Sequence, residues 1–557
     1  MTNQPKTRTG AQVLIDALAI NQVERIFSIP GESFLAALDA LYDKPQIALN
    51  ICRQEGGASY MAEAYGKLTG KPGVCFVTRG PGATNASCGL HVARQDSTPM
   101  ILLIGQIARK DQDREAFQEI DYRRMFSEVS KWVAQIEDAS RIPEYLNRAF
   151  ATATSGRPGP VVLALPEDML TDEVSVPDCK AWQPVAISPA TAQMQAVSEM
   201  LSTAEHPLIL VGGSGWNDHC RKQLEAFAES AQIPVANSFR CQDYFSHEHA
   251  NYIGDVGLGI NPALKQTIDE ADVLLVIGAR LGELTTGGFS LFSIPETRQK
   301  LIHVHAGAEE LGHIYAPELA INASSARFVD ALSQCHISPL EGRAKRLSEA
   351  RNSFLGWRQS VTIDGDVQLS DIVRTIAEKT ADDTIVCNGA GNHTAWIHRF
   401  YPFTQHRSQL APTSGTMGYG VPAAIAAKLQ QPQKTVVAFT GDGCFMMNGQ
   451  ELATACQYGA NVIIILINNG IYATIRMHQE REYPGRVIGT NMVNPDFCAL
   501  AKAYGMQAEL VTKTAEFGPA FDRALKADRP VLIEIQVDAN ILTPTTTVDS
   551  LRATTSD

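Results

Sequence analysis

The sequence lacks the patterns that mark membrane, secreted and nucleic-acid-binding proteins. No apolar run reaches the roughly 18–20 residues of a membrane-spanning helix, and the polar start (MTNQPKTRTG) has no signal-peptide core. The 11 cysteines form no CxxC pair, which favours reduced thiols over a disulfide framework. A net charge of −13 lacks the basic excess that attracts nucleic acid or an anionic membrane. We therefore predict a cytoplasmic protein with no nucleic-acid or membrane partner.

What is present is an ordinary globular composition in a long chain. Hydrophobic residues make up 45% and charged residues 19% of the 557 residues. A chain of this length exceeds a single core and suggests about three domains of ~150 residues each.

Amphipathic helices alternate with short apolar strands in three blocks, as expected for parallel sheets covered on both faces. A Pro-punctuated stretch, 171–189, separates the first block from the second, and a charged stretch, 341–358, separates the second from the third. We predict an α/β protein with three doubly wound parallel-sheet domains at residues 1–170, 190–335 and 365–545.

The third block contains two motifs that suit a diphosphate and its metal ion. A strand (434–439) leads to Gly441-Asp442-Gly443, a helix is expected at 448–458, and an apolar strand (462–467) leads to Asn468-Asn469. Both strands of a parallel pair end at one sheet edge, where open α/β sheets bind ligands. A carboxylate, an amide and backbone carbonyls suit Mg²⁺, and glycines let N–H groups approach an anion.

A candidate acid lies in the first block. Glu55 follows a strand (47–52) and precedes a helix that ends at Gly70, so its carboxyl can point out of the sheet edge. The small residues after it, 56–58, permit close approach of another body. Alone, a glutamate at a helix start is usually a dipole-stabilised surface residue, so its context decides.

That context is the segment 53–74 (RQEGGASYMAEAYGKLTGKPGV). Together with the GDG and NN motifs, it resembles the thiamine diphosphate-dependent decarboxylases and carboligases. The resemblance covers nearly the whole chain and favours the acetolactate synthase branch. Further segments similar to that branch follow in order at 80–85, 116–119, 155–161 and 415–420.

The resemblance implies a thiamine diphosphate-binding fold with thiamine diphosphate and Mg²⁺ as cofactors. A 2-oxo acid, pyruvate first of all, would lose CO₂, and the resulting enamine would attack a second carbonyl. Active sites shared between subunits are typical of the family, which implies a homodimer or homotetramer.

The resemblance also implies residue roles. Glu55 would hydrogen-bond the aminopyrimidine ring, and Met417 would hold the cofactor bent. Asp442, Asn469 and the Ile471 carbonyl would hold Mg²⁺. The other expected positions are Asn392, His393, Gly441, Gly443 and Cys444 at the diphosphate, Ile475 against the cofactor, and Phe117, Gln118 and His478 toward substrate.

Two departures leave the substrate open. Acetolactate synthases carry Trp where this chain has His478, and Tyr-Pro-Gly-Gly where it reads Ile29-Pro30-Gly31-Glu32. The pocket is therefore expected to be more polar. Arg476, His478 and Glu32 either recognise an acidic or hydroxylated acceptor or are merely solvated.

The middle block leaves FAD binding open. Members that bind FAD carry a GARFDDR run, of which this chain keeps Gly278-Ala279-Arg280 and loses the rest. The glycine-rich run 212–215 lacks the full dinucleotide fingerprint, so we interpret it as a turn and disfavour a Rossmann dehydrogenase.

Other activities remain as alternatives. A 2-oxo acid decarboxylase would protonate the enamine and release an aldehyde, but pyruvate decarboxylases usually carry paired histidines where only His91 occurs here. A carbon–carbon lyase acting on acyloins or diketones is another alternative. A binding protein without chemistry would not be expected to keep Glu55, Asp442 and Asn469.

Overall fold

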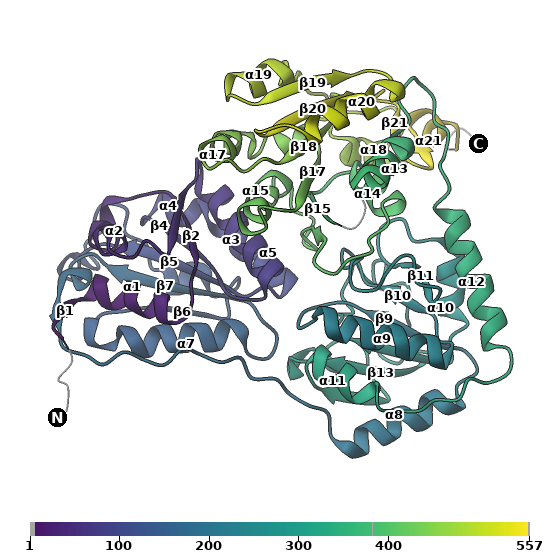
Figure 1. The fold of residues 1–557 in the computed structure, drawn as a ribbon, viewed down its shortest axis with the longest axis horizontal. Coiled ribbons are helices and arrows are strands. Elements are labelled where there is room, and N and C mark those ends of the chain that lie inside the picture. Colours follow the sequence, from purple (N-terminus) through teal and green to yellow (C-terminus); the bar gives the residue numbers. More distant parts are fainter. Residues whose placement is uncertain (1–5, 381–382, 555–557) are drawn as a thin grey trace. The chain divides into compact units, whose positions relative to one another are not determined.

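The computed structural model describes residues 6–380 and 383–554 and contains three six-stranded sheets, in which every strand pair is parallel (Figure 1). The chain forms two compact units. The first unit contains residues up to 185 together with 418–433 and 446–462, and the second contains 186–417, 434–445 and the residues from 463 onward. No helix among the described residues is long and apolar enough to cross a membrane.

The first sheet lies in the first unit, with strand order β3-β2-β4-β5-β7-β6. Its central strands are continuous apolar runs buried along their whole length, as expected for a parallel sheet covered on both faces. Helices α1, α2 and α7 share one hydrophobic core with alternate residues of these strands. The bounds are β2 Arg25–Ser28, β3 Ala48–Ile51, β4 Gly73–Val77, β5 Met100–Gln106, β6 Trp132–Gln135, β7 Pro160–Pro166, α1 Gly10–Ile20, α2 Leu35–Tyr42 and α7 Ile142–Thr154.

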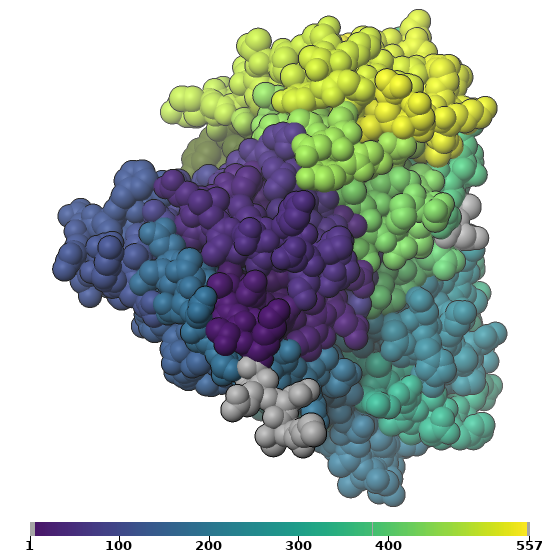
Figure 2. Space-filling model, turned by 60° about the vertical axis from the view of Figure 1, so that its left-hand side comes forward, coloured from purple at the N-terminus to yellow at the C-terminus, as the bar shows by residue number. Residues whose placement is uncertain are grey.

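Two later segments of the chain belong to the same unit. Helix α15 (Gly420–Gln430) packs along α3 (Glu55–Thr69), and a 3-10 turn (Gly449–Glu451) continues into α17 (Leu452–Gln457). Figure 2 colours the N-terminal residues purple and the later part of the chain, which includes α15 and α17, green to yellow. The unit that carries Glu55 is therefore completed by residues from the third predicted domain.

The second sheet has the order β11-β10-β9-β12-β13-β14. It is covered by helices α8 to α12, whose apolar residues join two core clusters with the strands. The bounds are β9 Pro207–Val211, β10 Val235–Asn237, β11 Tyr252–Asp255, β12 Val273–Ile277, β13 Lys300–His305, β14 Leu319–Asn322, α8 Thr191–Thr203, α9 Asp218–Ala231, α10 Pro262–Asp269, α11 Ser325–Leu332 and α12 Arg343–Trp357.

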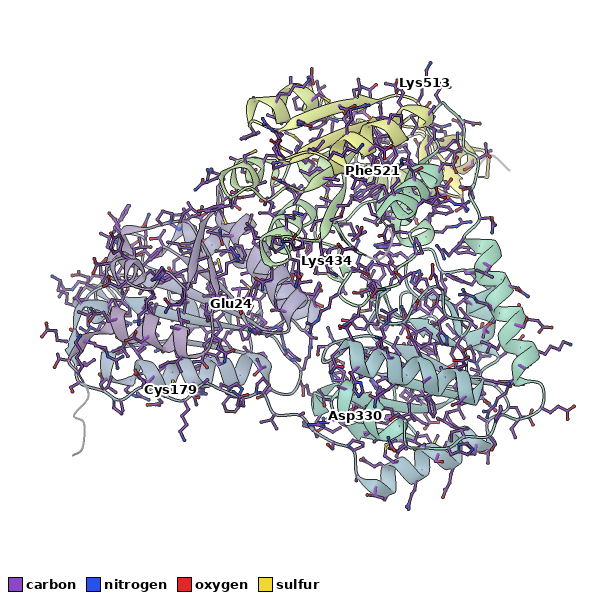
Figure 3. All side chains as sticks on the ribbon, in the orientation of Figure 1. Glu24, Cys179, Asp330, Lys434, Lys513 and Phe521 are labelled. Atoms are coloured by element: carbon purple, nitrogen blue, oxygen red, sulfur yellow. The ribbon has the colours of Figure 1, made fainter. Side chains whose placement is uncertain are left out.

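The third sheet has the order β16-β15-β17-β18-β20-β19. Helices α13, α14 and α20 pack their apolar faces on it, and Phe521 of α20, labelled in Figure 3, is fully buried in this core. The bounds are β15 Thr384–Asn388, β16 Gln409–Leu410, β17 Thr435–Gly441, β18 Ile463–Asn468, β19 Gln507–Val511, β20 Val531–Gln536, α13 Leu369–Thr380, α14 Thr394–Phe400 and α20 Thr514–Leu525.

The predicted fold class is confirmed, and the differences are local. The expected helix at 448–458 begins as a 3-10 turn, consistent with the poor helix propensity of Asn448 and Gly449. The expected linker contributes a strand, β8 (Glu173–Val174), that pairs antiparallel with β1 (Arg8–Thr9). The domain boundaries 1–170, 190–335 and 365–545 stay a prediction.

Candidate functional site

A buried carboxylate lies where β17 ends. Asp442 is the first residue of the short helix α16 (Asp442–Phe445) and is 3% exposed. Its Oδ1 accepts the Gly443 N–H at 2.8 Å, and its Oδ2 accepts the Gly470 N–H and the Asn494 side chain, each at 2.8 Å. Burial raises the pKa of this carboxyl, and the hydrogen bonds act against that rise.

The Asn pair lies beside Asp442 because β17 and β18 are neighbouring parallel strands, with Gly441 opposite Ile467. The Asn469 side-chain oxygen accepts the Ile471 N–H at 3.2 Å. Among the described residues, the partners of Asp442 are neutral donors, and no lysine or arginine pairs with it. A buried carboxylate with neutral partners next to amide and carbonyl oxygens fits a hard divalent cation.

The glycines of the GDG motif lie directly against neighbouring side chains. A Cβ on Gly441 would lie 2.8 Å from His393 Nδ1, and a Cβ on Gly443 would lie 2.6 Å from the Tyr472 ring. Glycine at both positions therefore lets His393 and Tyr472 pack directly against the backbone of this turn.

His393 is a buried histidine at the same edge, after β15. Its side chain has an Nε2 without a hydrogen-bond partner. Burial, together with the Arg240 guanidinium, lowers the pKa of His393 to about 3, so the ring is neutral at pH 7. An orphaned ring nitrogen beside the glycine turn fits a ligand group that would complete its hydrogen bonding.

Helix α18 (Ala473–Glu482) follows the Asn pair and carries the expected pocket residues. Ile475 and His478 are exposed on it. Thr474 donates to the Asn392 side chain at 2.8 Å, which ties the start of α18 to the loop after β15. The 490–492 segment also holds this start, since the Tyr472 N–H donates to the Thr490 carbonyl at 2.8 Å.

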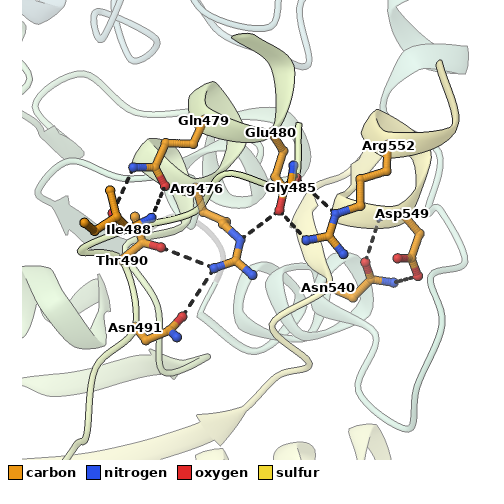
Figure 4. Close-up of polar contacts among 10 residues, drawn as sticks. All are labelled: Arg476, Gln479, Glu480, Gly485, Ile488, Thr490, Asn491, Asn540, Asp549 and Arg552. Atoms are coloured by element: carbon orange, nitrogen blue, oxygen red, sulfur yellow. Dashed lines mark hydrogen bonds and ion pairs between the residues drawn. The ribbon is translucent and has the colours of Figure 1, made fainter. Parts of the chain in front are cut away.

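The C-terminal segment fixes α18 through a fully buried carboxylate (Figure 4). Glu480 accepts Arg552 Nη2 at 2.6 Å and Nε at 3.0 Å, and it pairs with Arg476 at 3.2 Å. The hydrogen bonds from Arg552 lower the pKa of Glu480 to about 2. Arg552 belongs to α21 (Val548–Thr554), whose Val548 also packs with Ile471.

The same network engages Arg476, one of the residues considered for recognising the acceptor substrate. Arg476 Nη1 donates to Thr490 and Asn491, each at 3.3 Å, in addition to its pairing with Glu480. Its guanidinium is thus engaged within the protein. Glu32, by contrast, is exposed and lies 3.8 Å from Arg79, so it and His478 stay open to a ligand.

Glu55 lies in the first unit as the first residue of α3. Its Oε2 accepts the Asn85 side chain at 2.9 Å, and its Oε1 lies 3.4 Å from the place where a Cβ on Gly82 would stand. The carboxyl is half-buried, against the short helix α4 (Pro81–Asn85). One oxygen of Glu55 thus accepts a hydrogen bond, and the other faces a glycine. This second oxygen can therefore contact a ring nitrogen.

Phe117 and Gln118 lie on a strained loop next to that helix. Gln118 has φ +67°, and a Cβ on Gly80 would lie 2.7 Å from the Gln118 Cβ. Arg79 anchors the loop by donating to the Phe117 carbonyl at 3.2 Å and to Glu167 at 2.9 Å. Phe117 is 73% exposed. Strained backbone held by surrounding contacts is frequent at functional sites.

The structure thus gathers the expected residues in two groups. Glu55, Phe117 and Gln118 belong to the first unit. Met417 lies half-buried at a boundary of the second unit. The rest gather at the ends of β15, β17 and β18 and on α18: Asn392, His393, Gly441, Asp442, Gly443, Cys444, Asn469, Ile471, Ile475 and His478.

Sequence reasoning missed Asn494, Arg79, Glu451 and the pair of Glu480 and Arg552. Each partners a group far away in the chain, and none belongs to a motif of fixed spacing. The one sequence signal that could have indicated these residues is a polar side chain in an otherwise apolar helix or loop.

Comparisons with known proteins agree with this arrangement. Residues 8–125 match the N-terminal thiamine pyrophosphate-binding domain of thiamine pyrophosphate enzymes, residues 194–332 match their central domain, and residues 389–535 match their C-terminal thiamine pyrophosphate-binding domain. The fold and these matches define a thiamine diphosphate-dependent enzyme.

Full-length relatives narrow the class. The chain is 33% identical to the acetolactate synthase large subunit of Corynebacterium glutamicum, over 96% of this chain and 87% of that protein. It is 32% identical to the Lactococcus lactis large subunit, over 96% and 93%. It is 29% identical to the Escherichia coli isozyme 2 large subunit, over 95% of each chain. The chain belongs to the thiamine pyrophosphate enzyme family, in the branch that contains the acetolactate synthase large subunits.

The first prediction concerns His393. The pKa of His393 lies near 3 in the folded protein, and its ordinary value is 6.5. Between these pH values the unfolded chain therefore binds a proton at this histidine and the folded protein does not. Folding stability is therefore lost as the pH falls through 6.5, by about 2 kcal/mol between pH 7 and pH 5. His393→Gln should remove that part of the pH dependence in urea unfolding. Equal slopes for variant and wild type would contradict the burial argument.

The second prediction concerns Arg552. Arg552→Ala leaves the buried Glu480 with fewer donors, so the urea midpoint should fall more than in Arg523→Ala, which breaks the exposed pair of Arg523 and Glu509. The folded pKa of Glu480 is depressed, so this stabilisation is present above pH 4.5 and is lost as the pH falls toward 2. An equal midpoint shift in the two variants would argue against the network.

Proposed function

We propose that this enzyme decarboxylates a 2-oxo acid, pyruvate first of all, and joins the resulting two-carbon unit to a second carbonyl compound. The observation that supports this most is the full-length similarity to acetolactate synthase large subunits, with Glu55, Asp442 and Asn469 all in place. A chain that had lost the chemistry would not need to bury Asp442.

The geometry supports the cofactor-holding roles that the resemblance implies. Asp442, the Asn469 side chain and the Ile471 carbonyl would hold Mg²⁺, and the turn at Gly441, Gly443 and Cys444 would receive the diphosphate, with Asn392 and His393 beside it. Arg552, through Glu480, steadies the helix that follows Ile471. When bound, thiamine diphosphate supplies the thiazolium carbanion and the electron sink.

The remaining roles concern protons and substrate. Glu55 would hold a proton at the aminopyrimidine ring nitrogen while Asn85 keeps its other oxygen occupied. Met417 and Ile475 would pack on the cofactor. Gln118, set by the strained loop, would donate to the substrate oxygen, and Phe117 would exclude water.

This chain differs from acetolactate synthases at the positions expected to contact the acceptor substrate. His478 and Glu32 are exposed polar groups, so an acceptor more polar than a second pyruvate suits them better. The assembly we propose is a homodimer or homotetramer in which Glu55 of one subunit serves the cofactor held by another. Such sharing makes the active site depend on association.

FAD stays open as an additional cofactor. Arg280 of the retained Gly278-Ala279-Arg280 run donates to Glu310 at 3.1 Å. That contact gives the arginine a role inside the protein, and Gly278 packs closely against the Ser325 side chain and the Gly212 carbonyl.

The third prediction tests the activity with the full chain, thiamine diphosphate, Mg²⁺ and pyruvate, followed by proton NMR. Acetolactate, or a mixed product when aldehydes or other 2-oxo acids are added, is the expected result. Acetaldehyde alone would instead identify a decarboxylase. If pyruvate stays untouched while the cofactor binds, the donor is another 2-oxo acid or a diketone, and the pyruvate assignment fails.

Glu55→Gln serves as the variant in the same assay, because glutamine cannot share a proton with the ring. Turnover should fall by about 100-fold or more while thiamine diphosphate still binds. Glu144→Gln, at an exposed pair with Arg141, is the matched control and should behave as wild type. Turnover unchanged in Glu55→Gln would refute the role of Glu55.

A further inference from the structure

A buried glutamate holds the turn that precedes Glu55. Glu451, the last residue of the 3-10 turn before α17, is 0% exposed. Its Oε1 accepts the backbone N–H groups of Arg53 and Gln54, each at 3.0 Å, and its Oε2 accepts Arg53 N–H at 3.2 Å and Thr454 Oγ at 2.5 Å. The carboxylate therefore holds the two residues that precede Glu55.

These two N–H groups have no other protein acceptor among the described residues. Helix α3 begins at Glu55, and its N-cap residue Gln54 uses its side chain for the Gly57 N–H at 3.1 Å. The amides of Arg53 and of the N-cap residue Gln54 itself lie outside the helical hydrogen-bond ladder. Buried backbone donors are nearly always satisfied, and here one carboxylate satisfies both.

Glycine at position 57 makes this contact possible. A Cβ on Gly57 would lie 2.6 Å from Glu451 Oε1 and 2.9 Å from the carboxyl carbon. Any larger residue would push Glu451 away from the backbone that it holds. The second glycine after Glu55 is thus explained by Glu451 and not by helix propensity, which glycine lowers.

Neighbouring residues strengthen the same attachment. The Ile51 N–H donates to the Tyr458 hydroxyl at 2.7 Å, and Arg53 Nη2 donates to the Gln457 side chain at 2.5 Å. Residues 451–458 therefore hold the turn between β3 and α3 along its length. Among the residues that the structure describes, only Asn85 donates to the Glu55 carboxyl, so the direction of this carboxyl depends on how the turn is held.

We propose that Glu451 is a positioning residue for Glu55, which fixes the β3–α3 turn so that the Glu55 carboxyl meets the aminopyrimidine in a reactive orientation. The inference rests on the proposed role of Glu55.

The fourth prediction compares Glu451→Gln with Glu63→Gln in the assembled enzyme. Glu63 is a matched control: it is also 0% exposed, lies on α3, and accepts from Thr98 and Tyr419, but it supports no residue next to Glu55. Glu451→Gln replaces a carboxylate by a group with one acceptor oxygen, so the turn should loosen while the fold persists.

Two readouts separate positioning from general stability. In the cofactor-free protein, amide hydrogen exchange of peptides covering 52–57 should rise about 10-fold in Glu451→Gln and stay at wild-type rates in Glu63→Gln. With thiamine diphosphate and Mg²⁺ bound, exchange of the thiazolium C2 proton followed by NMR should slow by about 10–100-fold, with cofactor affinity within about threefold of wild type.

The outcomes are distinct. Wild-type exchange rates at both the amides and C2 in a folded Glu451→Gln protein would overturn the proposal, as would equal C2 slowing in Glu63→Gln. Should Glu451→Gln fail to fold, Glu451→Asp, which keeps the charge and withdraws it by one methylene, must show the slower C2 exchange. If Glu55→Gln leaves C2 exchange unchanged, the role of Glu55 fails while the amide result still reports on Glu451.

Discussion

The burial of the Asp442 carboxylate at the end of β17 is the constraint on which the proposed cofactor site depends. A buried carboxylate is costly unless donors and charge compensate it. Here the donors are backbone and amide groups delivered by Gly443, Gly470 and Asn494. These can converge only because β17 and β18 are adjacent and parallel, so the sheet order itself serves the site.

Two more buried carboxylates, Glu451 and Glu480, likewise hold segments of chain together by accepting several hydrogen bonds. Glu451 gathers backbone N–H groups upstream of α3, and Glu480 gathers Arg476, Arg552 and the Gly485 N–H. Each joins stretches of chain that are distant in sequence. Because removing a partner from a buried carboxylate is costly, such groups tie a segment to one position more specifically than apolar packing does.

Much of the fold could be read from local pattern. The strands are short apolar runs that alternate with helices, and this pattern indicated parallel sheets. The spacing from Gly441-Asp442-Gly443 to Asn468-Asn469 indicated a diphosphate site at a sheet edge. Both signals depend on residues that are near one another in the chain. Prediction failed where a turn was irregular, as at Asn448 and Gly449, and where the linker supplied β8.

The sequence by itself, through its resemblance to a known family, indicated the class of this protein, the candidate residues Glu55, Asp442 and Asn469, and the departure at His478, because motifs of fixed residue type and spacing carry that resemblance. Only the tertiary structure decided that Arg476 is engaged by Glu480, that α15 and α17 complete the unit of Glu55, and that Glu451 supports the turn before it. The physical reason is that these contacts join residues far apart along the chain, and their partners are chosen by folding and by the cost of leaving buried polar groups unpaired.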